Sequence, residues 1–257
     1  MNHLRYAISE YTKWFSGLAI IIGVIAVYPL CKVLALIVIG GCVLGALIFP
    51  LLVSFIKKDF TLKIIGNSKV TVHFGDLFED ECFLVTSNRF FDVDAEEGYI
   101  SKTSLLGLFV ERFYDNNIDK LKQFIKDNLE LDDDLKIQKA PYGKTIGFRD
   151  AGKYIYIMAF TDRKKTDQPK DFYFKAVKGF LNEITNANHG MTIAIPLIGD
   201  DNTLSNSGFS DSRMTFEGLV SVINNWGIEN PRVGLKLKIV ILPKKRSELI
   251  AAISKHT

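Results

Sequence analysis

Two long apolar stretches near the N-terminus place the strongest constraint on how this chain can fold. Between Lys13 and Lys57 the only charged residue is Lys32, which separates an apolar run over residues 14–30 from a second run over residues 33–56. As α-helices these runs would be roughly 26 and 36 Å long, and the hydrocarbon core of a bilayer is about 30 Å thick. Neither run has the polar stripe of a surface helix. The sequence therefore predicts a transmembrane helical hairpin.

The residues around the two runs predict the turn and the orientation of this hairpin. A lysine at mid-bilayer costs roughly 2.5–3.5 kcal/mol, and a tight turn at Lys32, close to Tyr28 and Pro29, removes that cost. Basic residues precede the first run and follow the second, namely Arg5, Lys13, Lys57, Lys58 and Lys63. The positive-inside rule then puts both termini in the cytoplasm. No clear small-residue cleavage site follows the first run, which disfavours a secretory signal peptide.

The rest of the chain, residues 61–257, has the composition of an ordinary globular domain. Five of the 32 Lys and Arg and two of the 29 Asp and Glu lie in residues 1–60, so the remainder carries 27 of each and is neutral. Nucleic-acid-binding domains usually carry a basic excess, so we expect no nucleic-acid partner. The length suffices for one sizeable hydrophobic core. The three cysteines lie in apolar segments and are expected to be packing residues.

The pattern of residues 61–257 alternates strands and helices. Short apolar runs bounded by turn residues predict strands over 61–65, 69–74, 82–87, 144–149, 154–160, 192–197 and 235–242. Apolar residues at helical spacing predict helices over 104–114, 118–129, 172–187, 214–226 and 247–254. This order implies an α/β fold with a mixed, largely parallel sheet and helices on both faces. In such sheets, ligands bind in the loops beyond the carboxyl ends of the strands.

Polar residues follow two of the expected strands. Gly75 permits a sharp turn after the strand 69–74, and the carboxylate of Asp76 can accept hydrogen bonds from an amino group such as adenine N6. Asn88 follows the strand 82–87, and its amide can both donate to and accept from ribose hydroxyls. Taken alone, Asp76 is more typical of a turn or helix cap, and Asn88 of an Asx turn. Both interpretations stay open at this point.

A third candidate loop follows the strongly apolar strand 192–197. Its first polar and turn-forming residues are Pro196, Gly199, Asp200 and Asp201, and it ends at an expected helix start. Backbone N–H groups in such a loop and at a helix N-terminus favour an anion, and Arg213 can add a charge-assisted contact to a phosphate. The two adjacent carboxylates argue against this interpretation, because they repel a phosphate.

The sequence contains no motif of a metal centre or of the common catalytic sites that we considered. The four histidines are scattered, and neither a nucleophile elbow nor a phosphate-loop lysine motif is present. We therefore expect no metal ion, no cofactor and no catalytic residue. The basic run Arg163-Lys164-Lys165 is expected to be a solvated loop rather than a binding patch.

Together, the strand-end residues resemble those of macro domains. In that family a Gly-Asp turn contacts adenine, a strand ending near an Asn contacts the distal ribose, and a late Pro-x-x-Gly loop surrounds the diphosphate. The matching residues here are Gly75 with Asp76, Asn88, and Pro196 with Gly199. With the hairpin in front, the chain more specifically resembles the macro-domain membrane effectors of Thoeris anti-phage defence. The segments that carry this resemblance are 72–78, 85–92, 98–107 and 193–199.

This resemblance implies a function and a set of ligand-binding residues. A partner protein with a TIR domain would convert NAD into an ADP-ribose-derived messenger. The cytoplasmic macro domain would bind that messenger, and the chain would then oligomerise and disrupt the bacterial inner membrane. The residues expected to bind the messenger are Asp76, Leu77, Asn88, Phe90, Phe91, Ser101, Leu105, Gly107, Pro196, Gly199, Asp200 and Arg213.

The sequence departs from conventional macro domains immediately after Asn88. Where those domains have a run of glycines that admits ADP-ribose to hydrolysis, residues 89–92 here are Arg-Phe-Phe-Asp. This departure favours sensing over catalysis. One alternative is a membrane-tethered ADP-ribose or ADP-ribosyl hydrolase, in which Asp92, Asp200 or Asp201 would activate water. Another is a membrane scaffold whose macro fold has lost its ligand.

Overall fold

The computed structural model describes residues 59–94, 98–115, 117–129, 138–163, 169, 171–187, 190–200 and 211–257. The predicted hairpin, with its apolar runs over 14–30 and 33–56, lies outside these residues. Among the residues that the structure describes, no helix is both long enough and apolar enough to cross a membrane. The described residues belong to one compact unit, which begins at Asp59.

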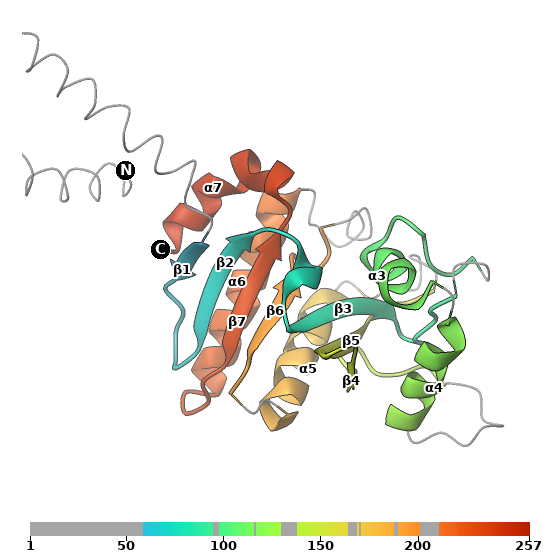
Figure 1. Cartoon of the computed structure of the whole chain (residues 1–257). Coiled ribbons are helices and arrows are strands. Elements are labelled where there is room, and N and C mark those ends of the chain that lie inside the picture. Colours follow the sequence, from blue (N-terminus) through green and yellow to red (C-terminus); the bar gives the residue numbers. More distant parts are fainter. Residues whose placement is uncertain are drawn as a thin grey trace, which may run out of the picture. The chain divides into compact units, whose positions relative to one another are not determined.

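In the described part of the chain, seven strands form one mixed sheet (Figure 1). They are β1 (Asp59–Leu62), β2 (Lys69–Phe74), β3 (Cys82–Asn88), β4 (Thr145–Asp150), β5 (Lys153–Thr161), β6 (Thr192–Pro196) and β7 (Lys236–Ile241). The order across the sheet is β1-β2-β7-β6-β3-β5-β4. The five central strands are parallel, and the two edge strands β1 and β4 pair antiparallel to their neighbours.

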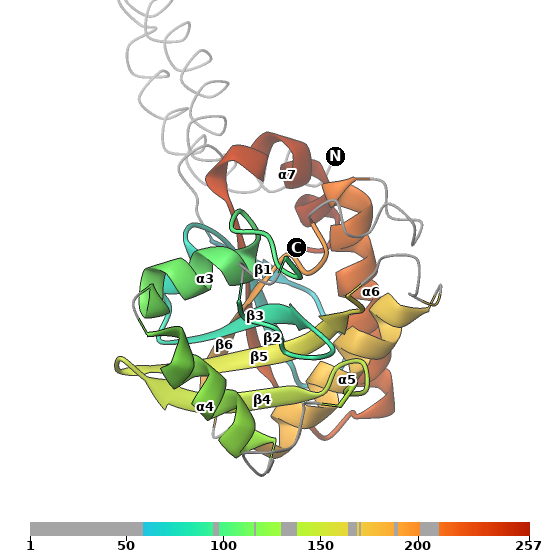
Figure 2. The ribbon, with the colours of Figure 1, turned by 90° about the vertical axis from the view of Figure 1, so that its right-hand side faces the viewer.

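Helices cover both faces of the sheet. Figure 2 shows α3 (Leu105–Tyr114) and α4 (Ile118–Asn128) on one face, and α5 (Phe172–Ala187) and α6 (Ser212–Glu229) on the other. The last helix, α7 (Arg246–Lys255), packs against α6. Two short 3-10 helices, η1 (Leu77–Glu79) and η4 (Pro243–Lys245), follow β2 and β7. The predicted three-layer α/β order is thereby confirmed.

The sheet separates two hydrophobic cores, and the alternation of side chains along β5 shows how. Ile155, Ile157 and Ala159 belong to the core beneath α3 and α4. Tyr156, Met158 and Phe160 point the other way and belong to the core beneath α5 and α6. Successive strand residues face opposite sides, so a strand buried on both faces requires an unbroken apolar run. This requirement explains why β5 has no polar alternation in the sequence.

The first strand differs from the prediction. It was expected over residues 61–65, but β1 begins at Asp59 and ends at Leu62. After Leu62 the backbone turns to other partners, because the Lys63 N–H donates to the His256 carbonyl at 2.6 Å and the Ile65 N–H donates to Asn224 Oδ1 at 2.8 Å. Phe60 and Leu62 are the inward-facing residues of the strand.

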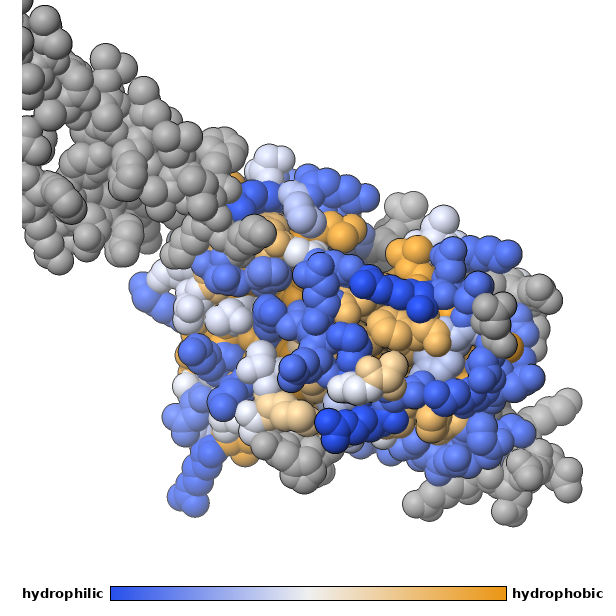
Figure 3. Space-filling model, in the orientation of Figure 1, coloured by the Kyte–Doolittle hydropathy of each residue, from blue (hydrophilic) through white to orange (hydrophobic). Residues whose placement is uncertain are grey.

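The parallel strands bring five chain segments to the side of the sheet where their carboxyl ends lie. We call this side the carboxyl edge, as distinct from the edge strands β1 and β4. β2, β7, β6, β3 and β5 all end there, and the segments that follow them are 75–80, 242–245, 197–200, 89–94 and 162–163. Ligands of open α/β sheets bind at this edge. The surrounding surface is mixed, since Figure 3 shows hydrophilic side chains interspersed with small hydrophobic patches, the usual pattern for a surface in contact with water.

Candidate functional site

Asp76 lies at the carboxyl edge, directly after β2 and Gly75. The Gly75 N–H donates to the Ile241 carbonyl at 3.0 Å, which extends the β2–β7 pairing by one residue before the chain turns. The carboxylate then caps η1, since Asp76 Oδ1 accepts a hydrogen bond from the Phe78 N–H at 3.0 Å. Its second oxygen, Oδ2, lies 2.6 Å from Nη1 of Arg112 on α3. The cap interpretation is therefore confirmed, and the carboxylate is also ion-paired.

The charge of Asp76 is fixed by these contacts. Burial alone would raise the pKa of the Asp76 carboxyl group. The hydrogen bonds from Arg112 and from the Phe78 N–H, with the charges of Arg112 and Lys153, outweigh burial and hold the pKa below its ordinary value. The side chain is still 42% exposed. Asp76 therefore presents an ionised acceptor at the carboxyl edge.

Asn88, the last residue of β3, is almost completely buried, and its amide is used within the following loop. Nδ2 donates to Asp92 Oδ2 at 2.9 Å. Oδ1 accepts from the N–H groups of Phe90 and Asp92 at 3.0 and 3.3 Å. This is the Asx-type arrangement that sequence alone favoured. In the described structure, Asn88 shapes the loop 89–92 through these three hydrogen bonds.

Asp92, which accepts from Asn88, also pairs with Arg163, a residue that follows β5 at the carboxyl edge. Arg163 Nε and Nη2 each lie 2.6 Å from a carboxylate oxygen of Asp92. The Arg163 guanidinium also lies 4.2 Å from the ring centroid of Phe90 and 4.2 Å from that of Tyr99. Arg163 is an exposed residue in a bend, as expected for a solvated loop, but its side chain has specific partners that the sequence did not predict. A bidentate carboxylate and two aromatic faces hold this side chain, while Lys164 and Lys165 lie outside the described residues.

Two of the predicted ligand-binding residues, Leu77 and Phe91, have side chains in the core beneath α3. They are 6% and 1% exposed. Phe91 has a backbone φ of 51°, in the left-handed region, and its N–H donates to the Asn88 carbonyl at 3.0 Å. Such a conformation costs a bulky residue on the order of 1–3 kcal/mol, which burial of the ring offsets. Contacts of these two residues with a ligand would have to come from the backbone.

The segment around the start of α3 is folded tightly against that helix. Ser104 caps α3 by accepting a hydrogen bond from the Gly107 N–H at 3.1 Å, and Ser101 Oγ lies 2.9 Å from Thr103 Oγ1. A Cβ on Gly107 would lie 2.2 Å from the Ser101 carbonyl oxygen. Glycine is therefore required at 107 for the loop to approach the helix. Leu105 is half-buried and packs on the core beneath α3.

The loop after β6 makes a tight turn at Gly199. Pro196 ends the strand, Gly199 has φ of 84°, and the Asp200 N–H donates to the Leu197 carbonyl at 3.0 Å. This is the position at which a type II turn requires glycine. Lys245 Nζ lies 3.1 Å from each carboxylate oxygen of Asp200. The repulsion expected between Asp200 and a phosphate is thus offset by a neighbouring cation, and Asp201 lies outside the described residues.

Arg213 directly follows Ser212, whose Oγ lies 2.6 Å from Nζ of Lys245, the partner of Asp200. Arg213 is an exposed residue of the first turn of α6 and lines a shallow groove between helices, together with Phe174, Met214, Glu217, Gly218, Ser221 and Lys255. Within the described residues, this lining contains none of the loop residues that carry Asp76, Asn88 or Gly199. The structure therefore brings together Asp76, Asn88, Phe90, Pro196, Gly199 and Asp200 at one sheet edge, and Arg213 lines the groove at the start of α6.

A buried charge cluster at the end of β5 was not anticipated. Asp162 lies 2.7 Å from Lys139 Nζ and 3.6 Å from Arg89 Nη1, and it accepts a hydrogen bond from the Tyr142 hydroxyl. Burial would raise the pKa of Asp162, but the hydrogen bonds from Lys139 and Tyr142 outweigh it and lower the pKa. Burial, with Asp162 as the second cause, raises the pKa of Tyr142 to about 12. Asp162 directly follows an apolar strand, the same signal that selected Asp76 and Asn88.

These contacts define what the carboxyl edge can do chemically. It offers an ionised acceptor at Asp76, a glycine turn at Gly199 and a capped helix start at Ser104. Its other carboxylates, Asp92 and Asp200, are each paired with a cation, Arg163 and Lys245 respectively. In the part of the chain that the structure describes, no three His, Cys, Asp or Glu side chains converge in a way that would hold a metal ion. This chemistry suits binding better than proton transfer.

The fold is that of a macrodomain. The Oceanobacillus iheyensis macrodomain with MES bound superposes with a TM-score of 0.51, at 12% sequence identity, and covers 77% of this chain and 94% of that chain. A single-substitution variant of the same macrodomain gives a TM-score of 0.50 at 13% identity, with the same coverage. At such low identity this likeness shows the fold alone.

The sequence gives a finer assignment. The family model described as "Thoeris protein ThsA, Macro domain" matches residues 70–241. This match spans more than half of the chain, so the chain belongs to the ThsA macro-domain family. A comparison with curated proteins returned no match.

Proposed function

We propose that this chain is a membrane effector of Thoeris-type anti-phage defence, in which the macro domain is the sensor. It binds an ADP-ribose-derived nucleotide made by a partner TIR-domain protein. Binding favours an oligomeric state whose N-terminal hairpins disrupt the bacterial inner membrane, with both termini in the cytoplasm. The observation that carries this proposal is the convergence of the loops of Asp76, Asn88 and Gly199 at the carboxyl edge, in a chain of the ThsA macro-domain family.

Each loop has a distinct part in binding the nucleotide. Asp76 accepts the adenine amino group, since its carboxylate is ionised and 42% exposed. Asn88 acts through the loop that it shapes, because its amide oxygen already accepts two hydrogen bonds. The turn at Gly199 supplies backbone N–H groups to the diphosphate, and Lys245 cancels the charge of Asp200 beside it. Phe90 and the segment 100–107 border the pocket.

The same contacts favour a sensor over the alternative, a membrane-tethered ADP-ribose or ADP-ribosyl hydrolase. A general base needs a free carboxylate near the reacting water. Asp92 is held by both Arg163 nitrogens and by Asn88, and Asp200 is held by Lys245. With their oxygens held by these partners, neither carboxylate is free to hold and activate a water molecule. We therefore propose that the chain is not an enzyme.

The proposal requires a specific driving force. The nucleotide can shift the chain towards the membrane-disrupting oligomer only if it binds that state more tightly than the resting state. The affinity for the nucleotide and the extent of membrane damage must therefore change together in variants of the site.

The test uses the full chain reconstituted in vesicles that contain a self-quenched dye. ADP-ribose, ADP-ribose conjugates and NAD are added separately, and dye release and nucleotide turnover are both recorded. We expect release with at least one ADP-ribose derivative, little release with Asp76→Asn, and no turnover. Turnover of the nucleotide without dye release would replace the sensor by the hydrolase. Neither release nor binding with any of these compounds would overturn the proposal.

A further inference from the structure

The chain enters the described domain at the carboxyl edge. β1 runs antiparallel to β2, so its first residue, Asp59, pairs with His73 near the carboxyl end of β2. His73 Nδ1 lies 2.6 Å from Asp59 Oδ1, which ties the first residue of the strand to that edge. The second apolar run ends at Ile56, and the three residues from there to Asp59 span at most about 11 Å.

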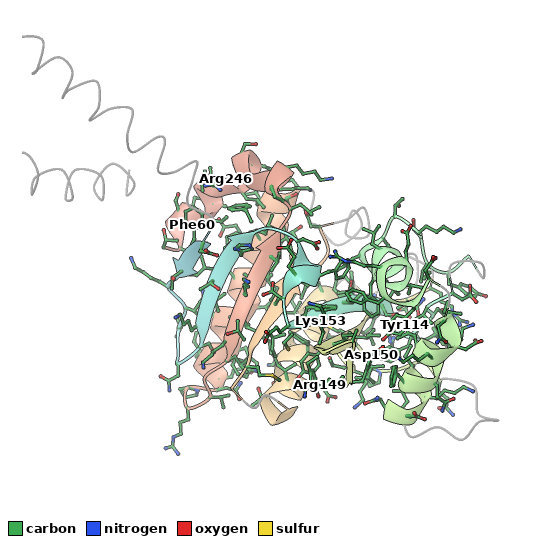
Figure 4. The ribbon with its side chains drawn as sticks, in the orientation of Figure 1. Phe60, Tyr114, Arg149, Asp150, Lys153 and Arg246 are labelled. Atoms are coloured by element: carbon green, nitrogen blue, oxygen red, sulfur yellow. The ribbon has the colours of Figure 1, made fainter. Side chains whose placement is uncertain are left out.

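A basic and apolar segment lies at the same corner of the domain. Residues 242–246, Leu-Pro-Lys-Lys-Arg, follow β7 and form η4 and the first residue of α7. Leu242 is 54% exposed although it is a large apolar residue, and the Lys244 side chain is also exposed. The Arg246 guanidinium lies 5.1 Å from the ring centroid of Phe74 and 6.0 Å from that of Phe60. Figure 4 shows Phe60 and Arg246 at this corner, where β1 and α7 meet.

Sheet geometry limits how far this segment lies from the start of β1. β7 is the second strand from β1, and neighbouring strands are about 4.8 Å apart, so the end of β7 lies about 10 Å across the sheet from Asp59. Asp59 is level with Val240 through His73, and Leu242 lies two residues, about 7 Å, further along. Adding the tether gives an upper limit of roughly 25 Å between Leu242 and the end of the apolar run. This limit depends only on chain length and on the sheet.

We propose that residues 242–246 form a lipid contact, in which Leu242 enters the headgroup region and Lys244 binds anionic headgroups. This inference rests on the proposed membrane function, because it takes the run that ends at Ile56 to be in the bilayer. Lysine is attracted to an anionic surface within a Debye length, and an exposed leucine beside it adds apolar contact at the interface. The carboxyl edge, with its nucleotide site, then lies next to the membrane that the effector acts on.

The opposite edge of the sheet supplies a matched control. Ile228, near the end of α6, is 57% exposed, and Arg232 is an exposed residue of the loop that leads to the start of β7. Both therefore lie at the amino edge of the parallel strands. The pair Leu242→Asp with Lys244→Glu reverses the polarity of the proposed contact. The pair Ile228→Asp with Arg232→Glu makes the same chemical change where no lipid contact is proposed.

The first measurement uses residues 59–257, which hold both hydrophobic cores and form a compact unit. The domain is sedimented with vesicles of phosphatidylcholine alone or with phosphatidylglycerol added. We expect binding that needs phosphatidylglycerol, falls at least threefold in the Leu242/Lys244 pair, and is unchanged in the Ile228/Arg232 pair. An equal loss in both pairs, or no dependence on phosphatidylglycerol, would overturn the lipid contact.

The second measurement uses the full chain in phosphatidylglycerol-containing vesicles, with a fluorophore on Leu242→Cys or Ile228→Cys after its native cysteines are replaced. A quencher attached to lipid headgroups should quench the label at position 242 several-fold more than the label at 228. Equal quenching in a chain that floats with the vesicles contradicts the lipid contact alone. A chain that does not float with the vesicles contradicts the proposed hairpin, and the sedimentation result then decides the lipid contact independently.

Discussion

Arg163 forms a bidentate ion pair with Asp92, in which Nε and Nη2 each lie 2.6 Å from one carboxylate oxygen. This pair joins the segments that follow β3 and β5. Asp92 is only 9% exposed in its side chain and also accepts a hydrogen bond from Asn88 at 2.9 Å. The three residues fix the loop 89–92, where conventional macro domains have glycines. This charged network connects the loop after β3 to the end of β5.

Replacing Asp92 by Asn should loosen this loop and weaken nucleotide binding together. The variant loses a charge-assisted pair at a nearly buried carboxylate, so we expect the free energy of unfolding to fall by about 1–3 kcal/mol. Urea denaturation and calorimetric titration with ADP-ribose measure the two effects. The control is Asp171→Asn, whose carboxylate pairs with Lys175 at 2.8 Å on the surface and which should change neither quantity. Full stability in Asp92→Asn would show that the ion pair does not hold the loop.

Asp76→Asn should separate the role of this residue in binding from its role as a cap. Asparagine is as good a helix cap as aspartate, so the fold should be retained, while the ionised acceptor for the adenine amino group is lost. We expect the affinity for ADP-ribose to fall about tenfold or more, the usual effect of losing a hydrogen bond to a charged group.

Arg112→Ala is the companion variant, because it removes the ion-pair partner of Asp76 and leaves the carboxylate in place. Its affinity should fall less than that of Asp76→Asn. If Asp76→Asn binds ADP-ribose as well as the unmodified chain, the adenine contact lies elsewhere.

Gly107→Ala should displace the segment 101–102 from α3. The added Cβ would lie 2.2 Å from the Ser101 carbonyl oxygen and 2.7 Å from that of Lys102, and both are backbone atoms that cannot swing away. Overpacking of this kind typically costs about 1–3 kcal/mol, measured as a lower thermal midpoint, and it should also weaken ADP-ribose binding. Leu108→Ala, one residue further along α3 and 45% exposed in the parent chain, should change neither. Equal midpoints for Gly107→Ala and Leu108→Ala would show that the backbone approach is not required.

The buried Asp162 cluster predicts a specific dependence of stability on pH. Because contacts with Lys139 and Tyr142 lower the pKa of Asp162 in the folded chain, its contribution is complete above the unfolded value of about 3.9 and is lost as the pH falls through the lower folded value. Asp162→Asn should cost about 1–3 kcal/mol at neutral pH, since it removes the buried carboxylate that pairs with Arg89 and with the more exposed Lys139.

Urea denaturation between pH 6 and pH 2 gives the comparison. The difference in unfolding free energy between the parent chain and Asp162→Asn should shrink as the solution is acidified below about pH 4. A difference that stays constant over this range would contradict the proposed charge cluster.

Most of the fold could be predicted from the sequence, because both faces of the sheet are covered. A strand such as β5, buried on both sides, appears as an unbroken apolar run, and α5 shows a clear apolar stripe. The two strands on which the site depends most, β2 and β3, were predicted to within one residue. β1 begins two residues and ends three residues before the predicted strand, because its boundaries depend on distant partners of Lys63 and Ile65, which a local pattern does not contain.

Only part of the candidate site could be predicted from the sequence. Polar residues directly after strands, such as Asp76, Asn88 and Asp162, carry a local signal. Their partners do not, since Arg112 lies on a helix and Arg163 in a basic run. Pairing between residues that are 36 or 71 positions apart in the chain leaves no pattern in either segment. The sequence therefore predicted which edge of the sheet to inspect, but not which carboxylates are ionised and already paired.

The measurement that tests the central claim most directly is calorimetric titration of residues 59–257 with ADP-ribose and its conjugates. This range is chosen because a boundary at residue 61 would remove half of β1. We predict one site with a Kd of about 100 μM or lower for at least one of these compounds, weakened by Asp76→Asn and unchanged by Asp171→Asn. The absence of binding heat and of thermal stabilisation with every compound up to millimolar concentration would contradict the account.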